Sequence, residues 1–107
     1  MRLQAHPSAK GDLRDILQYY ASVDDGGELA RDFHQRYLHG EGLIVSSPSL
    51  FNIRAGSVRR VNLKPRFGEY YIAYMIWKDQ VIILAIAHAK RKPYYWRHRI
   101  GEAKKMF

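Results

Sequence analysis

Residues 70–87 read YYIAYMIWKDQVIILAIA, and this stretch decides the fold. Residues 70–77 and 81–87 are apolar runs rich in aromatic and β-branched side chains, as is typical of β-strands. The polar residues 78–80 separate the two runs, which predicts an antiparallel hairpin. Both faces of this hairpin are apolar, although antiparallel sheets usually leave one face to water. We therefore expect helices to cover one face, and either the basic C-terminal segment or a second protein to cover the other.

The sequence that precedes this hairpin has a helical period. Residues 2–6 predict a short strand that ends at Pro7, and Ser8 is expected to cap the helix that follows. One face of this first helix carries the apolar residues Ala9, Leu13, Ile16, Leu17 and Tyr20. Beyond a turn at residues 24–27, a second amphipathic helix is expected, with an apolar face made of Leu29, Phe33, Tyr37 and Ile44.

The remaining segments complete an α+β order. Gly40 and Gly42 weaken the second helix, which leaves two interpretations open: a frayed end, or close contact with the first helix. Residues 58–63 alternate weakly and predict another strand. Pro93 suits the first turn of a short helix that carries Tyr95, Trp96, Arg97 and Arg99. The order predicts two helices packed on one face of a three- or four-stranded antiparallel sheet, with a first strand and a short last helix.

Length and composition bound the class of protein. A chain of 107 residues has room for one domain, residues 1–107. It has no cysteine, which excludes disulfides, zinc–thiolate sites and thiol catalysis. No stretch approaches the roughly 18 apolar residues of a membrane span, and the first residues lack the apolar core of a signal peptide. We therefore expect a cytoplasmic protein that does not bind membranes.

Charge is distributed unevenly along the chain. Residues 1–53 hold 5 Lys and Arg against 7 Asp and Glu, a net of −2, whereas residues 54–107 hold 13 against 3, a net of +10. Such a basic half favours a polyanion or an acidic protein as partner, although a solvated surface would look the same. Charge alone does not choose between these possibilities.

His88 is the first candidate for a catalytic residue. It follows the apolar run 81–87, and the like charges of Lys90 and Arg91 favour its neutral imidazole. A neutral imidazole there is able to act as a general base, or simply to hydrogen-bond the backbone. The other histidines show no metal-ligand spacing with carboxylates, so we expect no metal: His6, His34, His39 and His98.

Basic and aromatic residues supply the other candidates. A phosphate clamp is available from Arg59, Arg60, Lys64 and Arg66. Because Arg59 and Arg60 are neighbours on a strand, they must face opposite sides, and at most one shares a face with any given site. The aromatic residues 94–96 are suited either to stacking on bases or to a place in the core.

Three stretches, taken in order, resemble the RelE/ParE superfamily of toxins over nearly the whole chain. The first is the helix with Ala9, Asp12-Leu13, Ile16 and Tyr20. The second is Val58-Arg59-Arg60 with the hairpin that follows it. The third, His88-x-x-Arg91-x-Pro93-x-x-Trp96-x-x-Arg99, looks like the ParE branch. Gly68 departs from that branch, in which an aromatic-proline turn often follows the phenylalanine that matches Phe67.

The resemblance implies a toxin of a bacterial type II toxin–antitoxin system, held in a hetero-oligomer with a cognate antitoxin that is acidic or a ribbon-helix-helix protein. An acidic, partly apolar segment of the antitoxin would fold over helix and sheet, at Leu13, Tyr20, Tyr71, Met75 and Trp77. No cofactor is implied.

The resemblance leaves two targets. ParE-type toxins block DNA gyrase without catalytic residues, and here the target-binding residues would be Arg59, Arg91, Trp96, Arg97 and Arg99. RelE-type toxins cut messenger RNA on the ribosome without a metal, and here the catalytic candidates would be His88, Arg91, Arg60, Arg66 and Tyr95. The tail motif and the lack of a clear acid–base pair favour gyrase. A third reading is a non-toxic, basic nucleic-acid-binding module with steep salt dependence.

Overall fold

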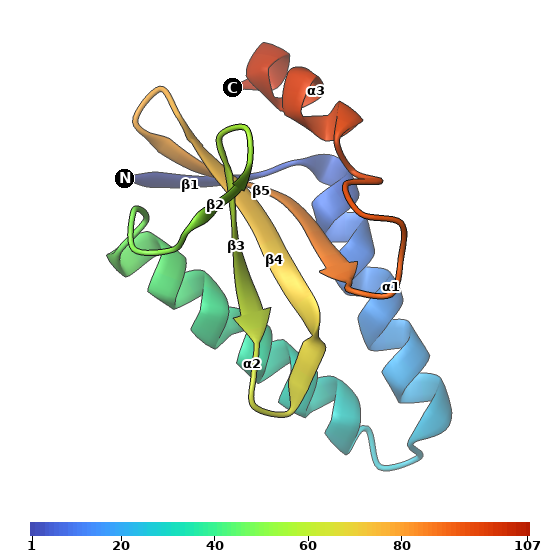
Figure 1. Cartoon of the computed structure of the whole chain (residues 1–107). Helices are drawn as coiled ribbons and strands as arrows, with labels where there is room; N and C mark the ends of the chain where they lie inside the picture. Colours follow the sequence, from blue (N-terminus) through green and yellow to red (C-terminus); the bar gives the residue numbers. More distant parts are fainter.

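The computed structural model describes the backbone of residues 1–107 and every side chain except that of Ala55. The elements follow in the order β1 (Arg2–Ala5), α1 (Pro7–Val23), α2 (Glu28–Ser46), β2 (Ile53–Ala55), β3 (Val58–Leu63), β4 (Phe67–Trp77), β5 (Gln80–His88) and α3 (His98–Met106) (Figure 1). The predicted α+β class is confirmed. Within the described residues, none of the helices has the length and apolar character needed to cross a membrane.

The strands form one five-stranded sheet in the order β1-β5-β4-β3-β2. The three central strands pair antiparallel as predicted, and the turn between β4 and β5 has Lys78 and Asp79 at φ 53° and 58°. Two positive φ values in a row are the mark of the type I′ hairpin turn, whose twist matches that of the strands. The sheet is larger than expected and mixed, because β2 adds an edge strand and β1 pairs parallel to β5.

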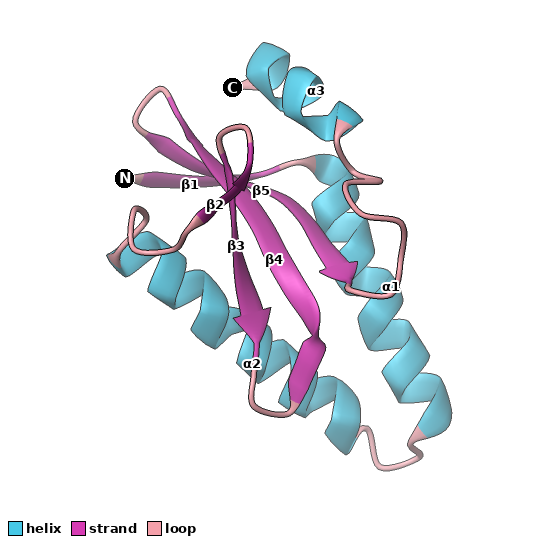
Figure 2. Ribbon diagram, viewed as in Figure 1, coloured by secondary structure: helices cyan, strands magenta, loops and turns pink.

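The helices α1 and α2 form a hairpin against one face of the sheet (Figure 2). The helix α3 is not part of this hairpin and lies near the start of α1. Apolar side chains fill the space on both faces. One cluster, between the two long helices and the sheet, includes Phe33, Ile44 and Tyr74. The other lies on the opposite face and joins Met75 and Leu84 of the sheet to residues of the C-terminal segment. Of the two covers expected for the second face, the chain's own tail is the one found.

The tail differs from the prediction in where its helix begins. Residues 93–97 form turns, and α3 starts at His98 rather than at Pro93. Tyr94 has a left-handed φ of 59°, which a helix of L-residues does not tolerate. The segment still buries Trp96 and Ala103 on the sheet.

The start of α1 corrects a second prediction. The N-cap is His6 and not Ser8: the ring atom Nδ1 of His6 accepts a hydrogen bond from the backbone N–H of Ser8 at 2.9 Å. Pro7 occupies the first helical position, where a missing N–H is harmless, so the cap falls on the residue before it. Because Nδ1 accepts, the neutral ring carries its proton on Nε2 and donates it to Glu102 of α3 at 2.9 Å.

Gly40 and Gly42 interrupt nothing, because α2 is continuous to Ser46. Gly40 is buried against the sheet, and a Cβ at this position would lie 3.1 Å from side-chain atoms of both Ile72 and Leu63. The close contact is therefore with the sheet and not with the first helix. Gly42 faces open space, since no atom lies within 4 Å of a Cβ built there.

Candidate functional site

The two arginines of β3 face opposite sides of the sheet, as predicted. The guanidinium of Arg59 donates to the backbone carbonyls of Phe51 at 2.5 Å and Ser49 at 3.2 Å, so it anchors the loop before β2. The guanidinium of Arg60 lies over the ring of Tyr71, 4.2 Å from its centroid, on the face that the tail covers. Only Arg60 is therefore on the same face as the tail residues.

Trp96 and Arg99, two of the predicted target-binding residues, are buried in contacts within the chain. The indole N–H of Trp96 donates to the hydroxyl of Tyr71 at 3.0 Å. Arg99 forms an ion pair with Asp12 of α1 at 2.7 Å, and the side chains of these two residues are 9% and 16% exposed. In this structure both residues hold the tail against the sheet.

The Asp12–Arg99 pair lies where β5 loses its outer neighbour. The pairing of β1 with β5 ends at Ala5 and Ile83, and Leu84 is an extra residue between the partners of Tyr74 and Ala73. This β-bulge leaves backbone groups without a strand partner. Arg99 donates to the carbonyl of Leu84 at 3.1 Å, and Asp12 accepts from the N–H of Ile86 at 3.1 Å. The ion pair therefore bonds backbone groups of β5 beyond the point where β1 ends.

His88 ends β5 beside a carboxylate that the sequence reading missed. Its Nε2 lies 3.2 Å from Glu69 Oε2, and its Nδ1 accepts from the N–H of Lys90 at 3.0 Å. The neutral ring thus donates from Nε2 to Glu69. Glu69 belongs to β4, and the antiparallel register that pairs Tyr70 with His88 brings it there. Pairing the two strands outward from their turn at residues 78 and 79 places Glu69 next to His88, so the sequence does contain this signal.

The other catalytic candidates are engaged in separate contacts. Arg66 forms an ion pair with Asp32 of α2, on the helical side of the sheet. Arg91 stacks over the ring of Tyr95, 3.9 Å from its centroid. Burial is the main cause that raises the pKa of the Tyr95 phenol, so this group stays protonated near neutral pH and is not a base.

The predicted antitoxin-binding residues lie on two faces. Tyr71 and Met75 are buried beneath the tail, and Trp77 is half-buried beside Lys104, whose Nζ is 4.8 Å from its ring. On the helical side, Tyr20 packs in an aromatic cluster with Phe33 and its neighbours. Of the five residues, Leu13 alone lines the groove described next.

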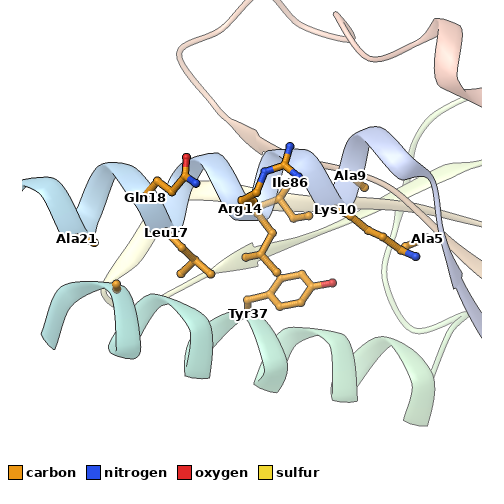
Figure 3. A pocket seen from close by; sticks show the side chains of 11 residues that line it. Ala5, Ala9, Lys10, Arg14, Leu17, Gln18, Ala21, Tyr37 and Ile86 are labelled. Atoms are coloured by element: carbon orange, nitrogen blue, oxygen red, sulfur yellow. The ribbon is translucent and has the colours of Figure 1, made fainter. Parts of the chain in front are cut away.

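A mostly apolar groove of about 530 Å³ runs between α1 and α2. Figure 3 shows Leu17 of α1 and Tyr37 of α2 in the space between the helices, with Lys10 at its edge. We call it the helix groove; its lining residues are Ala5, Ala9, Lys10, Leu13, Arg14, Leu17, Gln18, Ala21, Ala30, Tyr37 and Ile86. Among the side chains that the structure describes, no three His, Asp or Glu gather in a way that would hold a metal ion.

This architecture, a two-helix hairpin on a mixed sheet with a short C-terminal helix, is that of the RelE/ParE class of toxins. The chain belongs to the ParE family: the family model described as "ParE toxin of type II toxin-antitoxin system, parDE" matches residues 3–93 of the 107. No curated protein matches the sequence. The protein is therefore the toxin of a type II toxin–antitoxin system, and its family implies a cognate antitoxin as partner.

Proposed function

We propose that this toxin acts by binding and blocking DNA gyrase, with no catalytic residue of its own. The observation that carries the proposal is that the side chains of the catalytic candidates are engaged in contacts within the chain. His88 contacts Glu69, Arg66 contacts Asp32 and Arg91 contacts Tyr95. Cleavage of RNA needs a proton acceptor and a proton donor near one scissile phosphate, together with cations that hold it. Side chains that are already engaged in this way do not form a ready acid–base pair with a free phosphate clamp beside it.

The alternative is RNA cleavage on the ribosome, and one contact favours it. His88 and Glu69 are exposed enough to meet solvent, and a histidine oriented by a carboxylate is a known arrangement for a general base. Arg91 follows His88 by three residues and would supply a positive charge near it.

Two assays on purified toxin distinguish inhibition of gyrase from cleavage of messenger RNA. We expect it to stop supercoiling by gyrase and to leave ribosome-bound messenger RNA intact. His88→Ala should then lower the potency on gyrase only slightly, as should the control His39→Ala on α2. If the toxin instead cleaves the message, and His88→Ala lowers that rate by about 100-fold or more while His39→Ala does not, the protein is a ribonuclease.

We also propose that the helix groove receives an amphipathic helix of the antitoxin. Its floor is apolar, and the cations Lys10 and Arg14 line it, which suits a helix with one apolar and one acidic face. Leu13 and Leu17 would contact the apolar face of that helix.

Charge reversal tests this site without disturbing the core. The side chain of Arg14 is 71% exposed, and Arg14→Glu should weaken the antitoxin complex by about tenfold or more, because it places a like charge against the acidic face. Arg31→Glu is the matched control, since Arg31 is exposed and does not line the groove. Calorimetry with the product of the neighbouring gene measures both. Equal affinities of the two variants for the antitoxin would show that the antitoxin binds another surface of the toxin.

A further inference from the structure

A second hollow, which we call the C-terminal cleft, lies between the turn that joins β2 to β3 and the segment that leads into α3. Its volume is about 620 Å³, and its lining residues are Gly56, Ser57, Tyr94, Trp96, Arg97, Ile100 and Lys104. The β2–β3 turn and α3 lie at the same end of the molecule (Figure 1). The helix groove is made of other residues. A pocket of this size is in the range that small ligands occupy.

The two walls of the cleft differ in bulk. Gly56, at the turn, has a φ of 55°, and a Cβ built on it meets no atom within 4 Å. Tyr94 stands on the tail side with a φ of 59°, a conformation that few bulky residues adopt. Its hydroxyl donates to the carbonyl of Arg54 at 3.3 Å, and its ring packs edge-on to Trp96 at 5.7 Å. These contacts fix an aromatic ring beside an open wall.

The cations of the cleft lie on one face of the tail. Arg97, Ile100 and Lys104 are spaced at i, i+3 and i+7, so they project in the same direction. No Asp or Glu lines the cleft. Among the described side chains, neither Arg97 nor Lys104 forms an ion pair with a carboxylate. Two cations that no carboxylate neutralises therefore border the cleft, although the Nζ of Lys104 also lies 4.8 Å from the ring of Trp77.

We propose that the C-terminal cleft binds a nucleoside phosphate, with the base against Tyr94 and the phosphate between Arg97 and Lys104. A guanidinium fork holds two phosphate oxygens at once, and an ammonium adds a point charge. Every base has a π-face that stacks on an aromatic ring. The carboxylates of an acidic peptide would contact the two cations, but they have no flat ring to stack on Tyr94. Binding here does not depend on which macromolecule the toxin attacks.

Two probes separate the sources of the nucleoside phosphate. Adenosine 5′-monophosphate, followed by calorimetry, represents the free nucleotide, and a fluorescein-labelled hexathymidylate, followed by anisotropy, represents a single strand. Binding of either probe at the cleft supports the proposal. Binding of the mononucleotide indicates a pocket for one nucleotide, whereas binding of the hexamer alone indicates a strand that enters the cleft.

Matched variants assign the binding to the cleft. The double variant Arg97→Ala/Lys104→Ala should weaken binding by about tenfold or more, because it removes both phosphate contacts. Lys90→Ala/Lys105→Ala removes the same charge outside the cleft and should cost only about twofold. Tyr94→Ala should weaken binding by roughly fivefold to 100-fold through lost stacking, and Tyr94→Phe, which keeps the ring, should not. Arg97→Lys keeps the charge without the fork and should lie between wild type and the double variant.

Three results would overturn the proposal. One is the failure of both probes to bind the wild-type toxin. Another is an equal loss in the two double variants. The last is displacement of the hexamer by a hexaglutamate peptide as readily as by unlabelled hexathymidylate, which would make the surface a general polyanion site. Thermal unfolding of each variant checks that it is folded, and Tyr94→Phe with Arg97→Lys provides the comparison if an alanine variant is not.

Discussion

Removal of the Asp12 carboxylate tests the account of how the tail is held. Asp12 accepts from both Nη atoms of Arg99, at 2.7 and 3.3 Å, and from the N–H of Ile86 at 3.1 Å. Asp12→Ala leaves a guanidinium that is 9% exposed with Leu84 as its remaining acceptor, and it leaves the N–H of Ile86 without one. Breaking a buried ion pair by removing one partner costs about 3–5 kcal/mol. A domain of this size has a free energy of unfolding of only about 5–15 kcal/mol, so the variant should lose about a fifth of it at the least.

Urea unfolding measures this loss. With a slope of about 1–3 kcal/mol per molar urea, the midpoint of Asp12→Ala should fall by at least about 1 M. Asp15→Ala is the matched control on the same helix: its side chain is 75% exposed and its one partner, Arg14, is 3.9 Å away. The control should change stability by no more than about 0.5 kcal/mol.

The double variant Asp12→Leu/Arg99→Met completes the test. Replacing a buried ion pair by apolar residues of similar volume often changes stability little. The double variant should therefore recover much of the free energy of unfolding that Asp12→Ala loses. The reasoning is refuted if Asp12→Ala unfolds within about 1 kcal/mol of the control, or if the double variant is as unstable as the sum of its single substitutions.

Three further predictions concern the helices. The N–H of Leu29 donates to the carboxylate of Asp24, and this hydrogen bond is the main cause that lowers the pKa of that carboxyl. Asp24 therefore stabilises the fold above its unfolded pKa, and this contribution is lost as the pH falls below it. Asp24→Ala should lower the thermal midpoint at pH 7, and the difference from wild type should shrink below about pH 4. Gly40→Ala should destabilise the fold by about 1–2 kcal/mol because its methyl group would crowd Ile72 and Leu63. Gly42→Ala, which places a methyl group in open space, should stabilise the fold by about 0.5–1 kcal/mol. A change of the same sign for both variants in denaturant melts would contradict this packing. His6→Ala should lower the free energy of unfolding by about 1–2 kcal/mol because the helix loses its N-cap. Glu102→Gln keeps an acceptor for His6 and should leave the free energy of unfolding almost unchanged. Equal losses for the two variants in chemical unfolding would show that the charge of Glu102, rather than the cap, stabilises this end of the helix.

The sequence predicts those parts of this fold that repeat a pattern over many residues. The two long helices and the β4–β5 hairpin are of this kind, and so is the alternation that separates Arg59 from Arg60. The strand β2 has three residues and was missed, because so short a segment shows no period. The parallel pairing of β1 was missed because no local signal says which edge of a sheet the first strand joins.

The candidate site was harder to predict for the same reason. Asp12 and Arg99 are 87 residues apart in sequence, and their contact depends on a bulge in a third segment. The carboxylate of Glu69 reaches His88 only through the register of two strands. His6 was passed over as a cap because serine is the commoner capping residue. The residue types indicate which side chains are candidates for the site. Only the tertiary contacts show which of these side chains are already bound to other groups of the chain.

The position of the tail has a consequence for how the toxin is made. A ribosome adds about 5–20 residues each second, so the strands and both long helices are synthesised before Trp96 and α3. Until Trp96 and Ala103 are synthesised, the face of the sheet with Met75 and Leu84 lacks the apolar side chains that cover it in the folded structure. Apolar surface that is exposed during synthesis makes a nascent chain prone to aggregation, so this face is the part of the toxin that depends most on the tail.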